Sequence, residues 1–136
     1  MKIELTTKEY RRLLDLVYIG NWILNSARRS DRIPDFDEVE SKIFSYCKEH
    51  DMDSLVETVA GTCVPSQAFY EGGIHEAIMD YEDAVFYGIL AEVLAHRDLC
   101  FDENSLDSQA LAARTQSYIS EFEANGLNNV SVDTEL

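Results

Sequence analysis

Apolar residues recur at intervals of three and four along most of this chain of 136 residues. That spacing places them on one face of an α-helix, and it constrains the fold more than any other feature of the sequence. The pattern predicts an all-α fold with four main helices and one short helix. These helices are expected at about residues 6–29, 35–50, 74–97 and 105–125, with the short helix near 53–60.

The chain length fits one domain, which at this size buries roughly two thirds of its unfolded surface. Hydrophobic residues make up 46% of the chain, which is enough for one core. We therefore expect a single compact helical domain over residues 1–126. Residues 127–136 are mostly polar, and they are expected to form a loosely ordered tail.

Capping signals support two of these helix starts. Thr6 suits the N-cap position, and Glu9, three residues later, completes a capping box. Asp35 and Glu38 repeat the same spacing at the start of the second helix. Side chains of this kind accept hydrogen bonds from the backbone N–H groups that a helix leaves unpaired in its first turn.

The first helix is expected to carry an interaction surface on the side that faces away from the core. At about 100° per residue, its core stripe consists of Tyr10, Leu13, Val17 and Leu24. The opposite side combines an ion pair with two large apolar residues that should not face water. These surface residues are Ile19, Trp22, Arg11 and Asp15. They predict a homodimer centred on Trp22, unless the aromatic segment 61–73 or another helix covers them.

Acidic residues outnumber basic ones, with 26 Asp and Glu against 11 Lys and Arg and a formal net charge of −15. The division is uneven, because residues 1–30 carry six basic and three acidic residues, whereas residues 31–136 carry five and 23. An acidic surface repels nucleic-acid phosphates and anionic lipids. We therefore expect no nucleic acid and no membrane among the partners, and a basic protein is the partner that this charge favours.

Two further features bear on the compartment. No apolar stretch approaches the ~20 residues that a membrane-spanning helix needs, and the start of the chain lacks the pattern of a secretory signal. The three cysteines are an odd number without Cys-x-x-Cys spacing, which suits reduced thiols. These features predict a cytoplasmic protein.

A stripe of carboxylates is expected on the third main helix. Glu76, Asp80 and Asp83 follow the spacing i, i+4, i+7, which places them on one acidic face. Like charges at this spacing repel one another by roughly a few tenths of a kcal/mol. The stripe is either a solvated face or a docking face for a basic partner.

Glu92 and His96, one helical turn apart, continue an apolar line of the same helix. Their position predicts a buried polar pair. An alternative is half of a metal or acid–base site, since a carboxylate and an imidazole can share a proton or a metal ion. A two-metal helical bundle needs a second such element, and the sequence contains no matching pair on an inward face. We therefore expect no metal, no cofactor and no catalytic residue.

These features together favour a small acidic cytosolic protein that acts as a non-enzymatic protein-interaction module. It is expected to self-associate and to dock a basic partner protein. Two alternatives remain open. One is an enzyme or metal-binding helical bundle that uses Glu92 and His96, and the other is an acidic inhibitor or immunity-type protein that occupies a basic protein surface.

Overall fold

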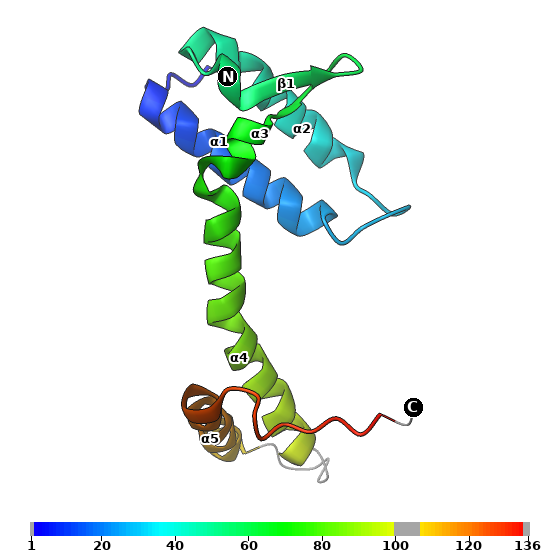
Figure 1. Cartoon of the computed structure of the whole chain (residues 1–136), viewed down its shortest axis with the longest axis vertical. Coiled ribbons are helices and arrows are strands. Elements are labelled where there is room, and N and C mark those ends of the chain that lie inside the picture. Colours follow the sequence, from blue (N-terminus) through cyan, green and yellow to red (C-terminus); the bar gives the residue numbers. More distant parts are fainter. Residues whose placement is uncertain (1, 100–106, 135–136) are drawn as a thin grey trace. The chain divides into compact units, whose positions relative to one another are not determined.

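The computed structural model describes residues 2–99 and 107–134 (Figure 1). Most of them are helical, and the strands among them form one small two-stranded sheet, so the predicted fold class is confirmed as mostly α. The chain divides into two compact units, the N-terminal unit (Met1–Glu76) and the C-terminal unit (Ala77–Leu136), which are described in turn. The predicted extent of one domain over residues 1–126, with a tail over 127–136, stays a prediction.

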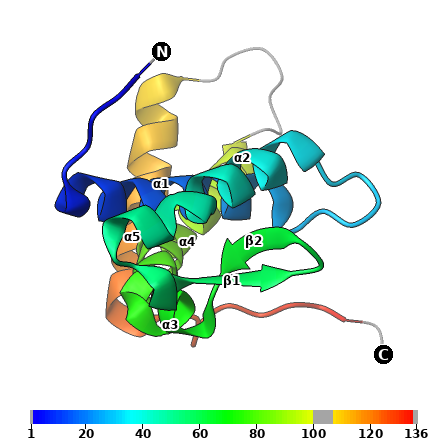
Figure 2. The same cartoon turned by 90° about the horizontal axis from the view of Figure 1, so that it is seen from above.

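The N-terminal unit packs two helices against each other and a β-hairpin against the second helix. Helix α1 contacts α2, and Figure 2 shows the hairpin beside α2. In chain order the elements are α1 (Thr7–Asn25), α2 (Pro34–Phe44), the 3-10 helices η1 (Ser45–His50) and η2 (Asp53–Leu55), the strands β1 (Val56–Val59) and β2 (Thr62–Pro65), the short helix α3 (Gln67–Phe69) and the π-helical turn η3 (Tyr70–Ile74).

Helix α1 begins as its capping box predicts. The Glu9 backbone N–H donates to Thr6 Oγ1 over 3.3 Å, and the Thr6 backbone N–H donates to Glu9 Oε2 over 2.8 Å. The helix ends at Asn25 rather than near residue 29, because the Asn25 side chain binds the loop that follows. Its Nδ2 donates to the Ile33 carbonyl and its Oδ1 accepts from the Ile33 N–H, both over 2.9 Å.

The buried face of α1 is rotated from the predicted core stripe. Its buried residues are Tyr10, Leu14, Tyr18, Asn21 and Asn25. Only Tyr10 of the predicted stripe is buried, whereas Leu24 is 38% exposed and the other two residues are half-buried. The Tyr10 hydroxyl donates to a backbone carbonyl of α2 over 2.7 Å, and Tyr18 packs against Phe69 of α3. These two contacts hold this face of α1 against α2 and α3.

Aromatic side chains form much of the core of the N-terminal unit. Phe44 and Phe69 are fully buried and meet edge to face with ring centroids 5.1 Å apart. Tyr18 meets Phe69 in the same way at 5.2 Å, and Tyr10 stacks on the His50 ring at 4.0 Å. Aromatic pairs in these arrangements add about 0.5–1.5 kcal/mol beyond the area that they bury.

The prediction of a short helix near 53–60 is wrong for the residues after Leu55, where η2 ends. The next four residues form β1, which pairs antiparallel with β2 and places Val56 opposite Pro65. Ala60 and Gly61 join the strands with φ angles of 50° and 80°. Both residues therefore have the left-handed backbone of a two-residue hairpin turn. The β-branched residues of the two strands favour this extended pairing over a helix.

The C-terminal unit is built on α4 (His75–Leu99), whose first two residues belong to the N-terminal unit, and on α5 (Ser108–Asn125). Asp107 caps α5, since its Oδ1 accepts from the backbone N–H two residues later over 3.0 Å. Residues 105 and 106, in the predicted start of this helix, lie outside the described residues. Phe122 of α5 is buried and lies 5.5 Å from the ring of Tyr87 on α4. Neither these helices nor the others in the described ranges combine the length and apolarity that a membrane span requires.

Candidate interaction surface

The surface predicted on the first helix is partly covered by its own unit. Arg11 and Asp15 form an ion pair, and both side chains are largely shielded from water. The Arg11 guanidinium lies over the Phe69 ring, 5.1 Å from its centroid. Ile19 and Trp22 are half-buried. The contact with Phe69 favours the alternative in which the aromatic segment 61–73 covers this side of α1.

Trp22 lines a small polar hollow between α1, α2 and η3. Its volume is about 210 Å³, and its lining residues are Tyr18, Asn21, Trp22, Asn25, Ser26, Arg32, Glu40 and Tyr70. The rings of Tyr18 and Tyr70 lie 5.6 Å apart, and the Tyr18 hydroxyl is 2.9 Å from His75 Nε2. Burial raises the pKa of Tyr18 to about 12, so its ring carries an uncharged hydroxyl at neutral pH.

The two charged residues that line this hollow are Arg32 and Glu40, and Asp37 lies beside it. Arg32 holds Asp37 through two hydrogen bonds of 2.6 Å, and this contact lowers the pKa of Asp37. Asn21 Nδ2 also donates to Asp37, over 3.0 Å. Burial raises the pKa of Glu40, and within the described part of the chain no Lys or Arg lies at ion-pair distance from it. Glu40 is therefore the carboxylate of the hollow without an ion-pair partner among the described residues, although Asn21 and the charge of Arg32 partly stabilise its ionised form.

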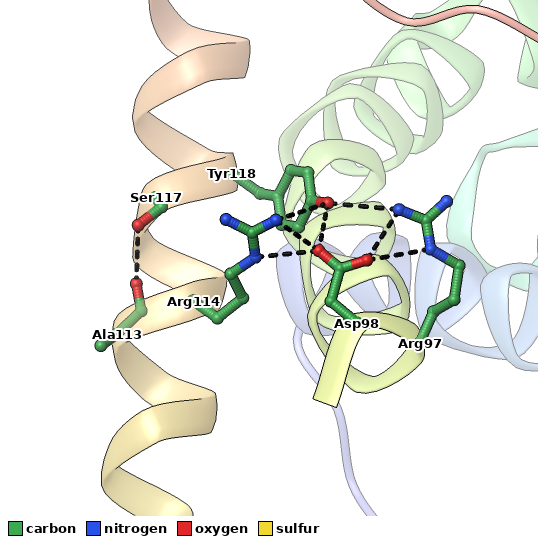
Figure 3. A network of polar contacts seen from close by, with 6 residues as sticks. All are labelled: Arg97, Asp98, Ala113, Arg114, Ser117 and Tyr118. Atoms are coloured by element: carbon green, nitrogen blue, oxygen red, sulfur yellow. Dashed lines mark hydrogen bonds and ion pairs between the residues drawn. The ribbon is translucent and has the colours of Figure 1, made fainter. Parts of the chain in front are cut away.

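In the C-terminal unit, a network of polar contacts joins α4 to α5 around Asp98 (Figure 3). Tyr118 donates its hydroxyl to Asp98 Oδ2 over 2.6 Å, and Arg114 donates to the same oxygen through Nε and Nη2 over 2.8 and 2.5 Å. Arg97 donates to Oδ1 over 3.1 and 2.8 Å. These donors hold the pKa of Asp98 far below its usual range.

This network uses both basic residues of its unit. Residues 77–136 contain Arg97 and Arg114 as their two Lys and Arg residues, against twelve Asp and Glu. Both guanidinium groups bind the same carboxylate. Among the described residues of the unit, no other carboxylate lies at ion-pair distance from a Lys or Arg. The three residues of the predicted acidic face, Glu76, Asp80 and Asp83, are exposed, and the first of them belongs to the N-terminal unit.

Helix α4 exposes large apolar side chains along one stripe. The apolar stripe consists of Met79, Phe86, Ile89 and Val93, which are 57%, 48%, 58% and 59% exposed. On a helical wheel the four residues fall within an arc of about 80°. Glu82 falls within the same arc, and Asp83 and Glu92 flank it. Apolar side chains bordered by carboxylates are the most distinctive surface of this unit.

Glu92 and His96 lie at the surface of the unit, so the expectation of a buried pair is wrong. Their side chains are 65% and 42% exposed, and the distance from Glu92 Oε1 to His96 Nε2 is 4.0 Å. Glu92 lies at the edge of the contact between α4 and α5, where it lines an open pocket with Leu111 and Thr115. Within residues 2–99 and 107–134, no three His, Cys, Asp or Glu residues are grouped as a metal ion would require.

The sequence analysis did not predict two of these features, the hollow of the N-terminal unit and the Asp98 network. The hollow forms because the fold brings Tyr70 and Glu40 beside Trp22. No local spacing in the sequence predicts that contact. The Asp98 network has one local sign, because Arg114 and Tyr118 are one helical turn apart.

In comparisons with known proteins, no protein-family model, curated protein or solved structure matches this chain.

Proposed function

We propose that this chain is a non-enzymatic protein-interaction module whose C-terminal unit docks a basic, amphipathic helix of a partner protein. The observation that carries the proposal is the apolar stripe on α4. Monomeric proteins rarely expose contiguous apolar patches larger than a few hundred Å², and exposed patches rimmed by polar residues are typical of binding surfaces. A partner helix that covered Phe86, Ile89 and Val93 would remove three large side chains from water.

The charge of the unit selects the partner. Carboxylates within and beside the stripe, at Glu82, Asp83 and Glu92, would meet Lys or Arg at the edges of an amphipathic helix. A second copy of the chain suits this face poorly, because it would bring two strongly acidic units together. We therefore assign the stripe to a basic partner rather than to a homodimer.

Self-association centred on Trp22 stays a separate prediction. Its residues Arg11 and Asp15 are engaged within the N-terminal unit, which leaves less of that surface available. Sedimentation of the wild type and of Trp22→Ala at high concentration tests it, since a dimer through this surface would become a monomer in the variant.

The docking proposal is tested with a synthetic helical peptide that carries Leu on one face and Lys along both edges of that face. Fluorescence anisotropy of the labelled peptide reports binding to the full chain. We expect binding that weakens as salt is added, because the contact depends partly on opposite charges. The double variant Phe86→Ala, Ile89→Ala should weaken binding by about tenfold or more, as expected when two central anchors are truncated.

A matched control removes similar side chains from another helix. Leu16 and Ile23 on α1 are 69% and 62% exposed, so Leu16→Ala, Ile23→Ala deletes comparable apolar area without touching the stripe. This control should bind as the wild type does. Equal weakening by both double variants would contradict the proposal. So would equal binding of a peptide with Glu in place of every Lys.

A further inference from the structure

The hollow of the N-terminal unit has aromatic walls. Tyr18 and Trp22 are one turn apart on α1, and Tyr70 on η3 lies 5.6 Å from Tyr18, ring to ring. Tyr18 is buried, whereas Trp22 and Tyr70 are half-buried and leave the hollow open to water on one side. Aromatic faces carry partial negative charge and attract cations placed against them.

A carboxylate completes this lining. Glu40 of α2 contributes a negative charge, while the Arg32 guanidinium is held by Asp37 at 2.6 Å. The frame around it is rigid, because Asn25 Nδ2 donates to Asn21 Oδ1 over 2.8 Å and both side chains are buried. The hollow therefore presents one carboxylate, without an ion-pair partner among the described residues, beside three aromatic rings.

We propose that this hollow binds an organic ammonium group, between the rings of Trp22 and Tyr70 and against the Glu40 carboxylate. A volume of about 210 Å³ accommodates such a group with a short carbon stem. Aromatic rings with a carboxylate suit an alkylated or primary ammonium, because the rings contact its carbon atoms while the carboxylate balances its charge. The group is carried either by a free small amine or by a lysine side chain of a protein. This site lies in a different unit from the apolar stripe and does not depend on the docking proposal.

Trp22 is the single tryptophan of the chain, so its fluorescence reports on the hollow directly. The full chain is titrated with choline and, separately, with N-acetyl-lysine methylamide, at constant ionic strength. We expect a saturable change in emission, with a dissociation constant on the order of 1 mM for the better ligand. A response to choline alone assigns the site to a small amine, and a response to the lysine derivative assigns it to a side chain. Failure of both would overturn the proposal.

Two controls separate cation binding from general solvent effects. The neutral alcohol 3,3-dimethylbutan-1-ol has the shape of choline without its charge, and it should leave the emission unchanged. Glu40→Gln should weaken binding by about tenfold, whereas Glu38→Gln on the same helix, outside the hollow, should not. Tyr70→Leu, which keeps apolar bulk but removes the ring, should weaken binding as well. Equal binding of the alcohol, or unchanged binding in both Glu40→Gln and Tyr70→Leu, would contradict the assignment.

Discussion

At the scale of single residues, Glu40 is a carboxylate held where its charge is poorly solvated. Burial raises its pKa and outweighs the opposing contribution of the Asn21 side chain, and the nearby Asp37 adds to the rise. A raised pKa in the folded state means that folding favours the protonated form. The resulting stabilisation is present below the ordinary pKa of Glu and is lost as the pH rises through the folded value. At neutral pH the ionised side chain therefore opposes folding.

Replacing this carboxylate by a neutral amide should stabilise the unit. Glu40→Gln is expected to raise the urea midpoint at pH 7, and the difference from the wild type should shrink near pH 4, where Glu40 itself becomes protonated. Urea unfolding at the two pH values measures this. A midpoint that falls at pH 7 would show that the Glu40 charge is stabilised in the fold, contrary to the argument.

The pKa of Asp98 is shifted in the opposite direction to that of Glu40. Hydrogen bonds from Tyr118, Arg97 and Arg114 lower its pKa. Its contribution to stability is therefore present above the ordinary Asp value of about 3.9 and is lost as the pH falls below it. Asp98→Asn should speed hydrogen exchange in α4 and α5 at neutral pH, and Asp80→Asn, on an exposed site of α4, should not. Identical exchange in both variants would mean that the network does not hold the two helices.

At the scale of elements, the rotated face of α1 is open to a direct test. Leu14 is fully buried and Leu16 is 69% exposed, although both are leucines two residues apart. Leu14→Ala should lower the free energy of unfolding by about 2–5 kcal/mol, because it leaves a cavity in the core. Leu16→Ala should change it by no more than about 0.5 kcal/mol. Denaturant unfolding of the two variants gives both values, and the reverse order would mean that the helix faces the other way.

The hairpin turn offers a second test at this scale. Ala60 has a φ of 50°, which residues with a Cβ adopt at a cost, whereas Gly61 at 80° does so freely. Ala60→Gly should therefore raise the free energy of unfolding by about 0.5–1 kcal/mol. Thermal unfolding measures the change. A destabilised variant would argue against a left-handed turn at this position.

The success of sequence reasoning varied with how local each signal is. The capping box of Thr6 and Glu9 needs a few consecutive residues, and it was predicted correctly. The second predicted box, Asp35 with Glu38, was wrong, because α2 begins at Pro34 after Ile33 and has no side-chain cap. The hairpin was missed because its strands are four residues long and its turn is Ala60–Gly61, without the Asn or Asp that usually marks such a turn. The buried face of α1 was misplaced because two of its buried residues are Asn21 and Asn25, and a count of apolar residues assigns such polar side chains to the surface. The hollow and the Asp98 network depend on tertiary contacts, and no single-helix pattern contains them.

At the scale of the whole molecule, charge and apolar surface are combined on the same unit. Residues 77–136 carry twelve acidic and two basic residues, and both basic residues bind Asp98. The remaining carboxylates keep like-charged molecules away, while the apolar stripe favours a partner that can cover it. We propose that this combination selects a basic, amphipathic partner and disfavours association of two acidic units.

The central claim is that binding of the basic helical peptide buries the apolar stripe of α4. Calorimetric titration of the full chain with this peptide at several temperatures measures the change in heat capacity on binding, which is negative when apolar surface leaves water. We predict a clearly negative value for the wild type and a smaller one for Phe86→Ala, Ile89→Ala. A heat capacity change near zero in the wild type, or the same value in both proteins, would contradict the claim and leave only attraction between opposite charges.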